Sequence, residues 1–110
     1  MRVMARVSIP VQDGNRAISD GSLPSLIQQT AERWHPEAMY FTTFDGRRTA
    51  FLIFEMPGTP DIPAFAEPFF TKLNAEVEIA PVMDGADLQK VVSICANHSS
   101  IESDSHSRWH

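Results

Sequence analysis

Cysteine and lysine are both scarce in this chain of 110 residues. The single cysteine, Cys95, excludes a disulfide within the chain and fits a reducing cytoplasm, where we expect the protein to be located. With only two lysines and a net charge of −5, the chain lacks the clustered positive charge that a nucleic-acid surface or an anionic membrane surface requires. We therefore expect no nucleic acid and no membrane among its partners.

Long apolar runs and the common cofactor motifs are missing as well. No stretch reaches the ~20 apolar residues of a membrane-spanning helix, and nothing at the start of the chain indicates a signal peptide. There is no glycine-rich phosphate loop, no CxxC, no HExxH and no GxSxG. His98, His106 and His110 lie in a polar stretch whose spacing does not suit a rigid metal site. We expect no cofactor and no metal.

What is present is a regular succession of strand and helix patterns, in a composition typical of one globular domain. The patterns predict strands over 2–11, 38–44, 48–56 and 75–83, and helices over 23–34, 62–73 and 84–93. Ser22 is the expected N-cap of the first main helix, and a helical turn can precede it from about Asn15. Asp45-Gly46 predicts a tight hairpin. Residues 1–94 form the expected domain, and 95–110 form a polar, flexible tail.

The order of these elements is β-α-β-β-α-β followed by a terminal helix, which predicts an α+β, ferredoxin-like fold. Its four-stranded antiparallel sheet has the spatial order 4-1-3-2, with both main helices on one face. The strand over 48–56 is apolar throughout, so either Phe51 and Ile53 or Leu52 and Phe54 face away from the helices. Because a large apolar face marks an interface, we expect a second copy to cover it around a two-fold axis.

The chain resembles the dimeric α+β barrel superfamily, which includes muconolactone isomerases and antibiotic-biosynthesis monooxygenases. More closely, it resembles a family of small uncharacterised bacterial proteins of this type. The stretches that carry the resemblance span about 1–94 and read GNRAISDGSLPSLIQQ, PEAMYFTTFDGRRTAFLIFEM, IPAFAEPFFTKLNAEVEIAPVM and ADLQK. The resemblance implies a homodimer, with a ligand cavity between sheet and helices.

The strongest candidate polar cluster consists of Arg6, Glu76 and Glu78. In the expected strand order these side chains point away from the helices on two neighbouring strands. Arg6 could hold a carboxylate or an enolate while Glu78 acts as a base, with Glu76 also in contact with the ligand. The same residues could instead form a cross-strand or intersubunit ion pair.

Trp34, His35 and Tyr40 complete the candidate site. His35 could transfer a proton at the mouth of the barrel, because imidazole titrates near neutrality, and Trp34 could contact a ligand. Alternatively, Trp34 is the last apolar position of its helix and His35 sits at the helix C-terminus, where the helix dipole favours it. Tyr40 could donate a hydrogen bond to a carbonyl oxygen or be a packed aromatic. Arg47 and Arg48, at the hairpin tip, are expected to be solvated.

Two functions are therefore expected. In the first, a dimeric barrel binds a small apolar or aromatic carbonyl compound, as an isomerase or a cofactor-free oxygenase, with His35, Glu78 and Tyr40 as catalytic groups. It requires an internal pocket of a few hundred cubic ångströms, the usual size for such sites. In the second, a non-enzymatic structural or regulatory dimer fills the barrel with its own side chains and pairs Arg6 fully with a carboxylate. Whether the protein is an enzyme stays open.

Overall fold

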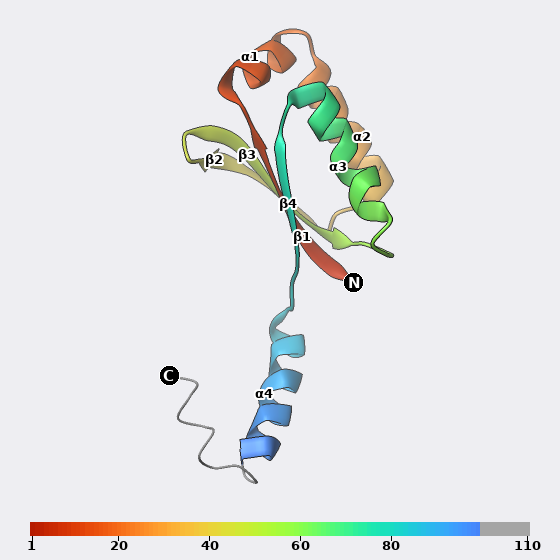
Figure 1. Cartoon of the computed structure of the whole chain (residues 1–110), viewed down its shortest axis with the longest axis vertical. Coiled ribbons are helices and arrows are strands. Elements are labelled where there is room, and N and C mark those ends of the chain that lie inside the picture. Colours follow the sequence, from red (N-terminus) through yellow and green to blue (C-terminus); the bar gives the residue numbers. More distant parts are fainter. Residues whose placement is uncertain (100–110) are drawn as a thin grey trace.

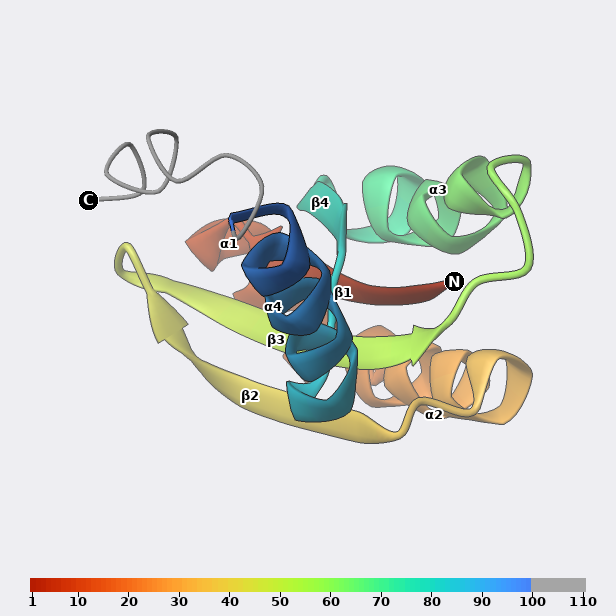
Figure 2. The same ribbon diagram turned by 90° about the horizontal axis from the view of Figure 1, so that it is seen from below.

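The computed structural model describes residues 1–99 and contains every predicted strand and helix. The elements are β1 (Arg2–Ile9), α1 (Val11–Ser19), α2 (Ser22–Trp34), β2 (Ala38–Phe44), β3 (Arg47–Glu55), α3 (Asp61–Leu73), β4 (Glu76–Pro81) and α4 (Gly85–Ser99). The four strands form one antiparallel sheet in the order β2-β3-β1-β4, which reads β4-β1-β3-β2 from the other edge. Helices α2 and α3 lie on the same face of this sheet (Figures 1 and 2). The architecture is α+β and compatible with a ferredoxin-like fold.

Three boundaries differ from the sequence prediction. Ser22 is the first residue of α2 rather than its N-cap, and Gly21 occupies the cap position with a left-handed φ of 80°. Helix α1 begins at Val11, directly after the strand, and so is longer than the turn expected near Asn15. Helix α4 continues to Ser99, into the expected tail, and the remainder of that tail lies outside the described residues.

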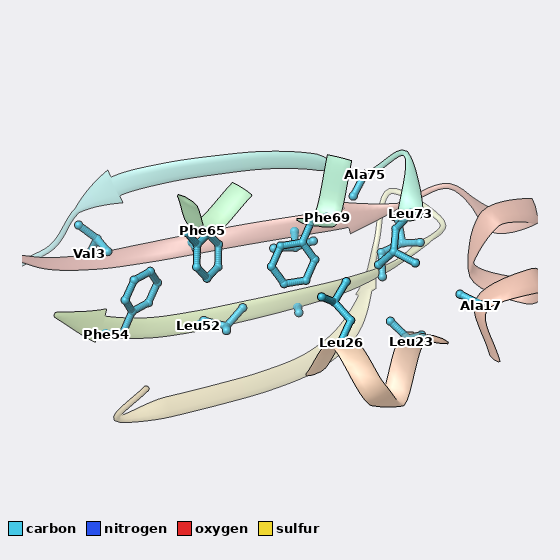
Figure 3. Packing of buried hydrophobic residues seen from close by; sticks show 14 of the residues in the cluster. Val3, Ala17, Leu23, Leu26, Leu52, Phe54, Phe65, Phe69, Leu73 and Ala75 are labelled. Carbon is cyan, nitrogen blue, oxygen red and sulfur yellow. The ribbon is translucent and has the colours of Figure 1, made fainter. Parts of the chain in front are cut away.

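The sheet face under the helices carries the core. On β1 the odd-numbered residues Val3, Ala5 and Val7 are buried, as the alternating pattern predicts. On β3 the residues paired with them include Leu52 and Phe54, both at most 2% exposed. These side chains meet Leu26 of α2 and Phe65 and Phe69 of α3 in one cluster (Figure 3). The register therefore assigns Leu52 and Phe54 to the helix side.

Phe51 and Ile53 consequently lie on the opposite face, together with the even-numbered residues of β1. We call this the open face, because none of the described helices covers it (Figures 1 and 2). Its middle is formed by Met4 and Arg6 of β1, which pair with Ile53 and Phe51 of β3. Tyr40 on β2 extends the same face and is 64% exposed. Aromatic and aliphatic side chains on this face favour contact with another surface.

Helix α4 leaves the body of the protein in the direction of β4 and gives the molecule its elongated form, 61 × 29 × 21 Å (Figure 1). Its first turn is attached to β1, because the Arg2 guanidinium lies 3.0 Å from the Asp84 carboxylate and 3.5 Å from that of Asp87. Farther along, the apolar side chains of the helix are exposed: Leu88, Val91, Val92 and Ile94. Leu88, Val91 and Val92 have the i, i+3, i+4 spacing of one helix face.

Candidate functional site

One row of side chains crosses the open face from edge to edge. Tyr40 pairs with Phe51, Phe51 with Arg6, and Arg6 with Glu78, so the four side chains belong to four adjacent strands. The Arg6 guanidinium lies 2.6 Å from the Glu78 carboxylate. It also stands 4.7 Å from the ring centroid of Phe44, in cation–π geometry. Three of the candidate site residues (Arg6, Glu78 and Tyr40) therefore share one row.

Glu76 lies in a neighbouring polar hollow of about 300 Å³ near the hairpin tip. This hollow is also lined by Arg6, Ser8, Phe44, Asp45 and Arg47. The Arg47 guanidinium lies 3.6 Å from the Glu76 carboxylate. Since Arg6 pairs with Glu78 and Arg47 with Glu76, each cation of the hollow already has a carboxylate partner. The arrangement can hydrogen-bond a polar group, but the described residues leave no cation without a carboxylate partner that could select an anion.

Trp34 and His35 lie elsewhere, at the end of α2 and on the helix side of the sheet. The Trp34 ring packs 5.5 Å from Phe54 and 5.8 Å from Phe65, so it closes the helix onto the sheet. His35 is the C-cap residue in a left-handed conformation (φ 47°), and its backbone N–H donates to the Ala31 carbonyl. Its side chain is exposed. These two residues thus occupy positions that helix termination and core packing explain.

A second hollow lies between the helices and the sheet, where the resemblance implies a ligand cavity, but the sequence did not identify the residues that line it. It is an apolar cavity of about 350 Å³ with contributions from α2, α3 and three strands. Its apolar walls include Val7, Leu23, Ile27, Phe41, Ala50 and Phe69. None of the six candidate site residues lines it. No carboxylate, imidazole or thiol of residues 1–99 lines it either, so this part of the chain gives the cavity apolar walls but no general base.

Among the described residues, the single charged side chain in the cavity wall is Arg48, which the sequence led us to expect in solvent. The side chain is half-buried and folds against α1, while its hydrogen bonds remain exposed. Its Nη2 donates to Oδ1 of Asn15 at 3.0 Å, and its Nη1 donates to the Val11 carbonyl at 3.5 Å. Gly14 makes room for this, since a Cβ atom there would lie 2.7 Å from Nη1 of Arg48.

The charge of Arg48 has no acidic partner within the part of the chain that the structure describes. Among residues 1–99, no carboxylate lies within 4.0 Å of its guanidinium, whereas Arg2, Arg6, Arg16 and Arg47 each have one. Burying part of an unpaired cation is unfavourable, so its position needs a compensating interaction. The neutral oxygens of Val11 and Asn15 supply part of it. The position of Arg48 could have been predicted from the alternation of side chains after the Asp45-Gly46 turn, because it places Arg47 and Arg48 on opposite faces of the sheet.

No group of three or more histidine, cysteine, aspartate or glutamate side chains within residues 1–99 could hold a metal ion. In the same part of the chain, no helix has the length and apolar character needed to cross a membrane. Compared with models of protein families, with curated proteins and with solved structures, the chain gives no significant match. The functional argument therefore rests on the geometry of the cavity and of the open face.

Proposed function

We propose that the protein is a homodimeric α+β barrel protein that binds a small apolar or aromatic carbonyl compound in the apolar cavity. The observation that carries this proposal is the cavity itself, with a volume of about 350 Å³. Small-molecule sites are concave, mostly apolar and about 300–1,000 Å³ in volume, with few polar groups that orient the ligand. The cavity has this character: aliphatic and aromatic walls, with Arg48 as its one charged group.

The homodimer is supported by the surface that one copy leaves uncovered. Tyr40 and Phe44 of the open face are 64% and 40% exposed, and Leu88, Val91, Val92 and Ile94 of α4 are exposed as well. A second copy related by a two-fold axis would place the same row of side chains opposite itself. Burying this face would remove exposed aromatic area from water, which is the main favourable term in association.

Catalysis has weaker support than binding. The residues assigned a catalytic role by the sequence lie apart from the cavity: Glu78 and Tyr40 on the open face, and His35 at the end of α2. An isomerase or a cofactor-free oxygenase would need one of these groups within hydrogen-bonding distance of the bound compound. We therefore place ligand binding first, with an enzymatic reaction as its extension.

A second candidate, a non-enzymatic structural or regulatory dimer, is favoured by one specific contact. The Arg6–Glu78 pair at 2.6 Å is what a barrel without a ligand on this face requires. The two candidates differ in what fills the molecule. A ligand-binding protein retains a cavity under its helices, whereas in a structural dimer side chains fill this space.

Calorimetric titration with 2-acetylnaphthalene, a small aromatic ketone, separates the two candidates. We expect saturable binding of one molecule per chain with a negative heat-capacity change, which marks burial of apolar surface. Ala50→Leu adds carbon atoms inside the cavity and should abolish binding. The matched control is Ala86→Leu, an exposed position on α4, which should bind as the wild-type protein does. Absence of binding to the wild-type protein would contradict the proposed function.

A further inference from the structure

Arg48 and the apolar cavity together indicate the chemical class of the ligand. This inference rests on the proposed function. The walls of the cavity would select for an apolar body of suitable size but not for any particular end group. Arg48 contributes to the wall, and its guanidinium, which bonds to Val11 and Asn15 of α1 beyond the cavity lining, lies at the edge of the cavity. No carboxylate among residues 1–99 balances its charge. We propose that the cavity is a site for apolar carboxylic acids, bound as anions with the carboxylate on Arg48.

The guanidinium has donors left for such a group. Two of its five N–H groups bond to Val11 and Asn15, which leaves three without a protein acceptor in the part of the chain described here. A carboxylate can accept two of them side by side, and hydrogen bonds between ionised partners are about twice as strong as neutral ones. A ketone or an alcohol can accept them too, but without the charge.

Contacts with α1 also orient Arg48 before a ligand arrives. Its two bonds to α1 hold the guanidinium, and Gly14 leaves the space that it occupies. A donor that is already oriented loses little conformational entropy when it binds, which improves affinity.

The neighbouring helix end adds positive potential rather than cancelling it. Arg48 lies at the N-terminal turn of α1, where the helix dipole is positive and favours anions. Asp13, the acidic residue of that turn, pairs with Arg16 at 3.3 Å instead of with Arg48. The helix dipole therefore does not explain why the Arg48 cation lies there. An anionic ligand would interact favourably with both the guanidinium and the helix N-terminus.

A matched pair of probes tests the inference: 2-naphthoate and 2-acetylnaphthalene share the ring system and differ in the carboxylate and the methyl ketone. Titration calorimetry at neutral pH should show the wild-type protein binding 2-naphthoate at least tenfold more tightly, as expected for a charged hydrogen-bonded pair. Arg48→Met should remove that preference while the ketone affinity stays within about twofold, which also shows that the cavity is intact. Arg48→Lys should restore part of the preference.

Two further variants separate the cavity from general charge effects. Arg47→Met removes an adjacent cation that faces the other side of the sheet, so the preference for the acid should remain. Gly14→Ala keeps Arg48 but displaces its guanidinium, so the preference should fall.

The outcomes are distinct. Equal affinity of the wild-type protein for acid and ketone, or an unchanged preference in Arg48→Met, would overturn the carboxylate inference and leave the proposed function standing. Failure of both probes to bind would overturn the proposed function as well.

Discussion

The Arg6 guanidinium lies 2.6 Å from the Glu78 carboxylate, and the two residues are directly paired across strands β1 and β4. In one copy the pair is partly open to water, with the Glu78 side chain 69% exposed. Exposed ion pairs contribute about 0–1 kcal/mol to stability. If a second copy covers this face, however, the pair becomes buried, and each partner then depends on the other.

The dimer can therefore be tested by exchanging these charges. Arg6→Glu or Glu78→Arg alone places like charges opposite each other on the open face, which should weaken the dimer at least tenfold. The double variant, in which the charges are exchanged, should recover most of the association. Sedimentation velocity over a range of concentrations measures this. A wild-type protein that is monomeric throughout the range would contradict the homodimer.

Trp34 should matter for stability rather than for ligand affinity. Its ring packs against Phe54 and Phe65 but lines no part of the apolar cavity. Trp34→Ala should lower the free energy of unfolding by about 2–4 kcal/mol, because the ring is only half-buried and full truncation of a buried Trp costs somewhat more. Denaturant titration gives this value. A stable variant that had lost ligand binding would instead support a role for Trp34 in the site.

Replacing His35 with glycine should raise the free energy of unfolding rather than lower it. A non-glycine residue in the left-handed region costs about 1–2 kcal/mol, and glycine avoids this cost at a smaller entropic one. His35→Gly should therefore raise the free energy of unfolding by about 0.5–1 kcal/mol and leave 2-acetylnaphthalene binding unchanged. His35→Ala retains the strain and serves as the control. Loss of 2-acetylnaphthalene binding in both variants would instead support a role for His35 in the ligand site.

The attachment of α4 should depend on pH. The backbone N–H of Asp87, at 2.8 Å, and the Arg2 guanidinium, at 3.0 Å, hold the pKa of Asp84 below its ordinary value of about 4. The stabilisation is then fully present above that ordinary value and is lost as the pH falls through the lowered pKa. The protection of backbone amides in the first turn of α4, measured by hydrogen exchange relative to the intrinsic rate at each pH, should fall in this acidic range.

Asp84→Asn should show the lower protection already at neutral pH, since the nearer of the two carboxylates through which Arg2 attaches the start of α4 has lost its charge. Glu32→Gln, which removes a surface charge on α2, is the matched control and should leave α4 unaffected. A protection factor in the first turn of α4 that does not change with pH would show that other contacts hold the helix.

The sequence predicted most of the fold because its strands alternate. The alternation of β1 placed Val3, Ala5 and Val7 in the core and Arg6 on the opposite face, and the register confirms both. Strand β3 could not be assigned in this way, since its apolar residues are continuous. Its faces follow instead from the two-residue turn, which pairs Phe44 with Arg47 and so sets the parity of every later residue.

The candidate site was predicted only in part. Alternation brought Arg6, Glu76 and Glu78 to one face, as expected, and the turn register adds Tyr40. A cavity between sheet and helices was expected from the resemblance, but its lining was not predicted, because it is formed by residues far apart in the chain whose packing leaves a space. Arg48 was missed for a related reason: its partners Val11 and Asn15 belong to α1, whose full length the turn-rich sequence did not indicate.

The most direct test of the central claim is to locate a bound ligand. Nuclear Overhauser effects between 2-acetylnaphthalene and the methyl groups of the protein distinguish the cavity from the open face. We predict contacts to Val7, Leu23 and Ile27, which line the cavity. Contacts to Met4 and Ile53 on the open face, or no contacts at all, would contradict it.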